Sequence, residues 1–225
     1  MREPSAKAWP AVAAARLPPP RRRVSMAELS DVNEWEGLDI EGEPAGMPSE
    51  AISITECLIS GVSFSALSMD GARLRDVVFE QCDLSALRLH EAALNRVEFR
   101  SCRMSGLQAP AAELRDVQFS DSKIDGANFR MSTLDRVRFT DCMLQSADFY
   151  SMKATMVRLF DCELTGADFS RASAAGTRLH GSVVDGVRGA DALAGAVIDP
   201  TQVVPFALSL IAALRVRIDD DRQDR

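Results

Sequence analysis

The sequence predicts an all-β solenoid, in which short strands wind into four-sided coils of 20 residues. Two observations support this prediction. Every position whose number ends in 4 or 9, from Ile54 to Val184, holds an apolar residue, so the apolar pattern has a period of five. The same residue types also return every 20 positions, as in "LRDVVFEQCDL" from Leu74, "LNRVEFRSCRM" from Leu94 and "LDRVRFTDCML" from Leu134.

A period of five matches neither the 3.6 residues of a helical turn nor the two-residue repeat of a strand. Repetition at a fixed spacing is instead typical of solenoids, whose coils stack like residues on like at about 4.8 Å. About seven such coils cover residues 51–190. We expect Phe79, Phe99, Phe119 and Phe139 to form one continuous stack inside them.

Residues 1–25 predict a disordered arm that is rich in Arg, Pro and Ala. They carry six basic groups and one acidic group, and they contain few residues that could join a core. Three interpretations of this segment stay open. In the first, the arginines contact nucleic acid. In the second, the segment is a targeting sequence. In the third, translation begins at Met26 and the segment has no function.

Both ends of the solenoid need caps, because an open coil presents unpaired strand edges. Residues 26–50 carry eight acidic groups and no basic one, and they predict an acidic N-terminal cap segment. We expect its apolar residues Trp35, Leu38 and Ile40 to cover the first coil.

Residues 191–225 predict a C-terminal capping helix followed by a charged tail. Asp199 is the expected N-cap and Pro200 the first helical residue, and the helix extends through Leu214. Its side chains are apolar nearly all round, so one face can cover the last coil while another stays available for a partner.

The residue types that usually carry chemistry are scattered. The five cysteines, at positions 57, 82, 102, 142 and 162, lack the spacing of a disulfide framework or a zinc site, and they indicate a reducing compartment, so we expect the cytoplasm. His90 and His180 fall on different sides of the coil, with no partner evident for a nucleophilic triad. We therefore expect no enzyme, no metal and no cofactor. No apolar run approaches the length of a membrane helix, so no membrane association is expected.

The units "GANFR" at 126, "SADFY" at 146 and "GADFS" at 166 resemble the A(D/N)Lxx repeat of the pentapeptide-repeat proteins. The resemblance covers about 140 residues. It implies a right-handed quadrilateral β-helix, with the central Leu or Phe and the residue two positions before it inside the coil, and the other three positions outside. C-terminal helices often mediate dimers in this family, so the resemblance also implies a homodimer, for which Phe206, Leu210 and Leu214 are the candidate contacts.

We expect such a chain to be a non-catalytic scaffold for protein–protein interaction, with a protein partner that the sequence does not name. The resemblance also implies an alternative, a DNA mimic that binds DNA gyrase or another type II topoisomerase and gives quinolone resistance. Residues 51–190 carry 18 acidic and 16 basic groups, whereas duplex DNA carries one charge about every 1.7 Å. The near-neutral coils therefore favour the scaffold, and we expect no direct binding of nucleic acid. An undetected enzyme ranks third.

Four apolar residues stand at outward positions that other coils fill mainly with polar residues: Met131, Tyr150, Met156 and Phe160. Exposed Met and aromatic residues are enriched at interaction surfaces. These four are therefore the candidate partner-binding residues, as two patches that join Tyr150 to Met131 and Met156 to Phe160. The alternative is that they are ordinary exposed apolar residues.

Charged residues at outward positions also form columns. Asp76, Arg96, Asp116 and Arg136 alternate in sign, which predicts a solvated ladder of ion pairs. A stripe of aspartates at 121, 141 and 161 lies near a stripe of arginines at 138, 158 and 178. We expect these two stripes to compensate each other.

Overall fold

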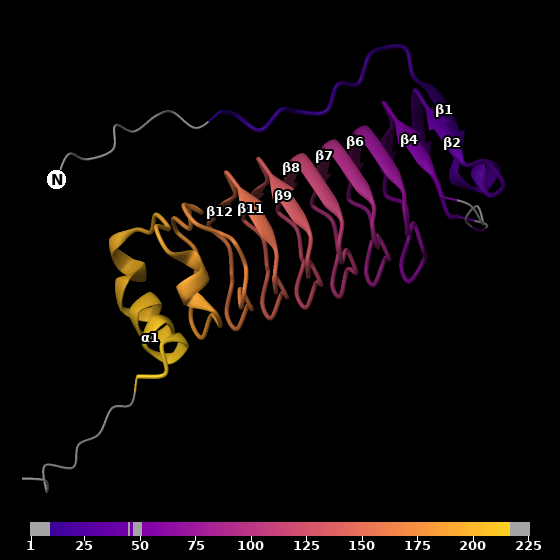
Figure 1. Cartoon of the computed structure of the whole chain (residues 1–225). Coiled ribbons are helices and arrows are strands. Elements are labelled where there is room, and N and C mark those ends of the chain that lie inside the picture. Colours follow the sequence, from indigo (N-terminus) through magenta and orange to yellow (C-terminus); the bar gives the residue numbers. More distant parts are fainter. Residues whose placement is uncertain (1–9, 45, 47–50, 217–225) are drawn as a thin grey trace, which may run out of the picture.

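The computed structural model describes residues 10–44, 46 and 51–216, and it shows a parallel β-helix (Figure 1). The coils stack into an elongated body, with β1 and β2 at one end and α1 at the other. All strand pairs in the described sheet are parallel, and from β4 onward the paired residues lie 20 positions apart. The predicted fold class, a β-solenoid of about seven turns with a C-terminal helix, is therefore confirmed.

Most strands occupy one side of a coil, and the three longest ones continue around a corner. The strands are β1 (Arg22–Ser25), β2 (Glu34–Glu36), β3 (Leu38–Glu41), β4 (Ser53–Thr55), β5 (Leu58–Ser60), β6 (Arg73–Glu80), β7 (Ala93–Arg100), β8 (Glu113–Ser120), β9 (Thr133–Asp135), β10 (Arg138–Thr140), β11 (Lys153–Thr155) and β12 (Arg158–Phe160). The described helical segments are η1 (Met26–Leu29), η2 (Ala190–Leu193), η3 (Pro200–Gln202) and α1 (Val203–Ala213).

The corners explain how a five-residue repeat makes a four-sided coil. Every residue whose number ends in 1 or 6, from Glu56 to Gly186, has a positive φ, between 49° and 77°. This left-handed conformation suits glycine and costs other residue types about 1–2 kcal/mol. Hydrogen bonds to the next coil offset the strain, as where the N–H of Asp121 donates to the carbonyl of Thr140 at 3.1 Å.

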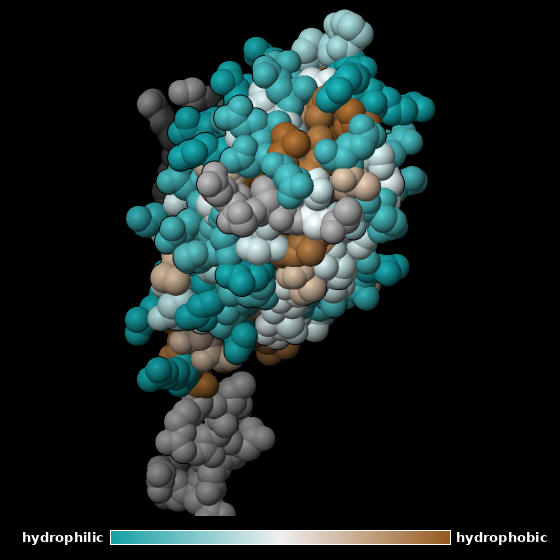
Figure 2. All heavy atoms as spheres, turned by 90° about the vertical axis from the view of Figure 1, so that its right-hand side faces the viewer, coloured by the Kyte–Doolittle hydropathy of each residue, from teal (hydrophilic) through white to brown (hydrophobic). Residues whose placement is uncertain are grey.

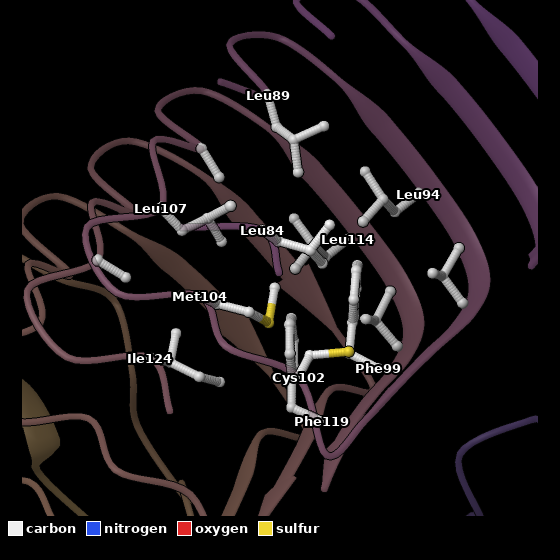
Figure 3. Close-up of a cluster of buried hydrophobic side chains, with 14 of the residues drawn as sticks. Leu84, Leu89, Leu94, Phe99, Cys102, Met104, Leu107, Leu114, Phe119 and Ile124 are labelled. Carbon is white, nitrogen blue, oxygen red and sulfur yellow. The ribbon is translucent and has the colours of Figure 1, made fainter. Parts of the chain in front are cut away.

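The phenylalanine column forms the predicted interior stack. The four rings are buried and nearly parallel, with centroids 5.1, 4.9 and 4.6 Å apart in the order Phe79, Phe99, Phe119 and Phe139. In Figure 3, Phe99 and Phe119 point into the space that the coils enclose, among leucines from the other sides. We call this side of the coils the phenylalanine side. The side before it in the chain is the leucine side, and its inner residues are Leu74, Leu94, Leu114 and Leu134.

The N-terminal cap is a partial coil. β2 and β3 pair with β4 and β5, so that Trp35 lies on Ile54 and Ile40 lies on Ile59. These partners are 19 positions apart, so this coil is one residue shorter than the others. Trp35, Leu38 and Ile40 are buried. Seen from this end, the surface is mainly hydrophilic, with a few separate hydrophobic spots (Figure 2).

Residues 10–25 differ from the disordered arm that the sequence predicts, and residues 1–9 lie outside the described part. β1 pairs with β3, and an ion pair between Arg21 and Asp39 accompanies this pairing. The basic segment is thus held by the acidic cap through opposite charge as well as strand pairing. Residues 10–21, which we call the arm, run extended along the outside of the coils (Figure 1).

The C-terminal cap starts with the predicted N-cap. The carboxylate of Asp199 accepts the N–H of Thr201 at 2.9 Å, and the side chain of Gln202 accepts the N–H of Asp199 at 2.9 Å. Gln202 also donates to the carbonyls of Leu179 and Ser182. Its buried amide therefore satisfies main-chain groups that the last coil would otherwise leave open.

Candidate functional site

Side chains fill the interior of the described coils. A cavity between Leu89, Phe99 and Phe129 has a volume of about 10 Å³, close to the smallest space that holds one water molecule. Such a space does not admit a ligand, so the outward side chains are the candidates for recognition.

The arm lies on the phenylalanine side and on the corner that precedes it. Three of its N–H groups donate to carboxylates of successive coils: Ala13 to Asp116 at 3.3 Å, Ala15 to Glu98 at 2.8 Å and Arg16 to Asp76 at 3.0 Å. At the other end, the carbonyl of Pro10 accepts from Nη2 of Arg158 at 2.7 Å. These contacts span about four coil steps, or roughly 19 Å. Six residues cover that distance only when they are extended.

The arm buries residues that the repeat places outside. Asp76 is 3% exposed, and Val78, also at an outward position, is 2% exposed. Glu98, Asp116 and Arg158 are buried as well. Sequence reasoning missed this contact, and the apolar Val78 at an outward position was the available signal.

The alternating charges at this corner form the predicted ion pairs, but their carboxylates are buried rather than solvated. Two hydrogen bonds of 2.6 Å join Arg96 to Asp76, and two of 2.8 Å join Arg136 to Asp116. The hydrogen bonds from Arg136 hold the pKa of Asp116 below its ordinary value, although burial opposes them. Burial alone would raise the pKa of Asp76. The hydrogen bonds from Arg96 and from the arm outweigh burial, so this pKa is also below its ordinary value.

The arginine stripe lies on the phenylalanine side, from the last coil of the ladder toward the C-terminus. Arg138, Arg158 and Arg178 lie in register on successive coils. Burial, followed by the charges of the other two arginines, lowers the pKa of Arg158. The aspartates that are predicted to compensate this stripe stand three residues further along each coil, at the next corner.

A shallow groove of about 560 Å³ runs along the leucine side. Its lining combines both signs of charge, from Arg73, Arg75, Glu113, Arg115 and Asp135. Nε of Arg115 lies 3.3 Å from the carboxylate of Asp135. The charged side chains that line the groove therefore partly neutralise one another.

The structure brings together the first predicted patch. The N–H of Met131 donates to the carbonyl of Tyr150 at 2.9 Å, and the Met131 residue is 59% exposed. Two guanidinium groups lie over the half-buried Tyr150 ring, with Cζ of Arg130 at 4.2 Å and Cζ of Arg171 at 5.7 Å from its centroid. We call these four residues the Met–Tyr patch.

The second predicted pair, Met156 and Phe160, is not brought together. Met156 is exposed at a corner, and Phe160 is half-buried four residues later, about 13 Å along the chain. The Phe160 ring packs edge-on against His180, with 5.9 Å between centroids, and the guanidinium of Arg138 lies 5.9 Å from it. These two residues are separate surface features.

The cysteines are free and buried. Burial raises the pKa of Cys57 to about 11, so its thiol stays protonated at neutral pH. His90 lies beside Glu91, and His180 lies against Phe160. Within the residues described, no three His, Cys, Asp or Glu side chains are arranged to hold a metal ion.

Helix α1 covers the last coil with one face and leaves another face exposed. Of the three predicted dimer contacts, Phe206 packs against the core and Leu210 is half-buried, whereas Leu214 is exposed. The outward face carries Val204, which is 67% exposed, with Leu208 at 59% and Leu214 at 61%. None of the helices in the described part of the chain has the length and apolar content needed to span a bilayer.

The family comparison matches the coils. A model described as a pentapeptide repeat region matches residues 52–129 and 94–169, and a model of pentapeptide repeats in eight copies matches residues 157–188. No curated protein matches the chain.

Solved structures are similar over most of the chain at low identity. A trypsin-treated form of QnrB1, a plasmid-mediated fluoroquinolone resistance protein, is 18% identical and covers 88% of this chain and 95% of its own, with a TM-score of 0.48. HetL, a pentapeptide repeat protein involved in heterocyst differentiation regulation in the cyanobacterium Nostoc, is 16% identical and covers 78% and 84%, with a TM-score of 0.32.

Proposed function

The chain belongs to the pentapeptide-repeat family, and from this premise we propose that it is a non-catalytic scaffold. It binds another protein through the outward side chains of its coils. The observation that supports this function is the Met–Tyr patch, where the exposed Met131 lies beside Tyr150 and two arginines lie over the tyrosine ring. Met, Tyr and Arg are the residue types enriched at protein interfaces.

The proposal includes a homodimer formed through α1. Val204, Leu208 and Leu214 present apolar area that an isologous contact between two helices would bury. It also includes action in the cytoplasm, because buried free thiols fit a reducing compartment.

A binding experiment with matched variants tests the patch. The full chain is used to capture and identify its partner from cells that produce it, and the purified partner is then titrated against wild type, Tyr150→Ser, Met131→Ser and Met143→Ser. Met143 is the control, because it is 46% exposed but lies on another side of the coil. We expect the first two variants to weaken binding by about tenfold or more. The control should bind like wild type.

All three variants should melt like wild type, since the replaced side chains are at outward positions. Equal dissociation constants for all variants would show that recognition occurs elsewhere on the coils.

A separate measurement tests whether the chain binds DNA gyrase, the alternative partner. The ladder carboxylates Asp76 and Asp116 are paired with arginines, which leaves little of the continuous negative charge that a DNA mimic needs. Supercoiling by purified gyrase is measured with and without the chain, in the presence and absence of a quinolone. Inhibition, or protection from the drug, at micromolar concentration would identify the partner as gyrase. Unchanged supercoiling would leave the scaffold with a different partner.

A further inference from the structure

The phenylalanine side holds an extended polypeptide, and that polypeptide is the chain's own arm. We propose that this side is a binding surface for an extended segment of a partner protein, and that residues 10–21 occupy it in cis until the partner displaces them. The inference rests on the scaffold function proposed above, and it names the surface and the chemistry of the partner.

Recognition of the arm is mainly by its main chain. Three N–H groups and one carbonyl of the arm hydrogen-bond to side chains of the coils. Among the arm residues, all of which the structure describes, Val12 is the one that is buried. Hydrogen bonds to the main chain do not depend on side-chain identity. A foreign segment therefore fits if it is extended and carries small residues where the arm has Ala13 and Ala15.

The surface is complete without the arm. Each carboxylate that accepts an arm N–H also has an arginine of the coils as partner: Asp76 has Arg96, Asp116 has Arg136 and Glu98 has Arg100. Departure of the arm therefore leaves none of these three carboxylates as an unpaired buried charge, which would be strongly destabilising. The acceptors stay oriented for the N–H groups of another chain.

A partner competes with a tethered ligand. A short link gives an attached segment an effective concentration on the order of millimolar. A free segment of similar affinity binds weakly while the arm is docked, and it binds measurably once the arm is weakened. The docked arm thus raises the concentration or the affinity that a partner segment needs in order to bind.

A peptide titration tests the proposal in the full chain. The substitutions Ala13→Pro and Ala15→Pro remove two of the three N–H donors of the arm and leave the coils unchanged. A fluorescent peptide with the sequence of residues 10–21, PAVAAARLPPPR, is titrated against wild type and the double variant by anisotropy. We expect it to bind the double variant about tenfold or more tightly than wild type, because the docked arm no longer competes.

Two controls identify the site. The same peptide with proline at positions 13 and 15 should not bind the double variant. Adding Glu98→Leu to the double variant should abolish the gain in peptide affinity. This change removes the carboxylate that accepts the N–H of residue 15 at 2.8 Å, while Arg100 stays solvated. The proposal is overturned if the peptide binds neither protein, binds both equally, or binds no better than its proline form. The Met–Tyr patch takes no part in this titration, so such a failure would leave the scaffold function to its own test.

Discussion

The N–H of Arg16 donates to the carboxylate of Asp76 at 3.0 Å, although the two residues are 60 positions apart in the chain. The contact joins the arm, which has no repeat, to the coils, whose residue types repeat every 20 positions. The ladder at this corner therefore does two things: its aspartates pair with arginines of the neighbouring coil, and they hold main-chain donors from outside the coils.

Asp116→Asn should lower the free energy of unfolding by about 1–3 kcal/mol at neutral pH, because charge-assisted hydrogen bonds from Arg136 are lost. The pKa of Asp116 is below its ordinary value of 3.8 in the folded chain. Its ionised form therefore stabilises the fold above that pH, and this contribution disappears as the pH falls through the folded pKa.

Urea unfolding of wild type and Asp116→Asn at several pH values checks this expectation. The difference in free energy should be constant near neutral pH and shrink below about pH 4. A difference that does not change with pH would show that the carboxylate charge is not involved.

Phe119→Ala should destabilise the chain by about 3–5 kcal/mol, because its ring stacks between Phe99 and Phe139 at 4.9 and 4.6 Å. Phe119→Asp should abolish folding, because an unpaired charge in the interior costs more than the marginal stability of a domain. Thr140→Ala, at an outward position of the same side, is the control and should change stability by less than about 0.5 kcal/mol. A soluble, β-rich Phe119→Asp protein with wild-type melting would disprove the interior stack.

The interior could be predicted from the sequence because the repeat fixes it. Many inner residues of the coils stack on their own kind, so the column from Phe79 to Phe139 can be recognised from the sequence alone. The docking of the arm could not be predicted, because its contacts are made by main-chain N–H groups that nearly every residue carries. The inward face of α1 could not be predicted either. The helix is apolar nearly all round, and the shape of the last coil decides that Phe206 packs inward while Leu208 stays outside.

Two glycines at positive φ should respond differently to alanine. At Gly126, with φ of +62°, an added Cβ meets no atom within 4 Å, so Gly126→Ala should cost only the backbone strain of about 1–2 kcal/mol. At Gly189 the added Cβ would lie 2.3 Å from the backbone nitrogen of Ser170 and 2.7 Å from the carbonyl carbon of Phe169. Gly189→Ala should therefore lower the melting temperature clearly more than Gly126→Ala. Equal melting temperatures would contradict this packing.

Leu208→Arg should convert the proposed dimer to a monomer, because it places a charge in the centre of the exposed apolar face of α1. Val183→Arg is the control, since Val183 is an exposed apolar residue on the coils rather than on the helix. Light scattering at tens of micromolar, where a specific interface of standard size usually holds, gives the mass. A monomeric wild type at that concentration would rule the dimer out.

Amide hydrogen exchange of the full chain tests most directly whether the coils hold an extended polypeptide on their outside. The N–H groups of Ala13, Ala15 and Arg16 should exchange about tenfold or more slowly than in the free peptide of residues 10–21, because each hydrogen bond to a carboxylate must open first. Glu98→Leu should return the N–H of Ala15 to the rate of the free peptide. Exchange at the free-peptide rate at all three positions of the wild type would show that the arm is not held on the coils.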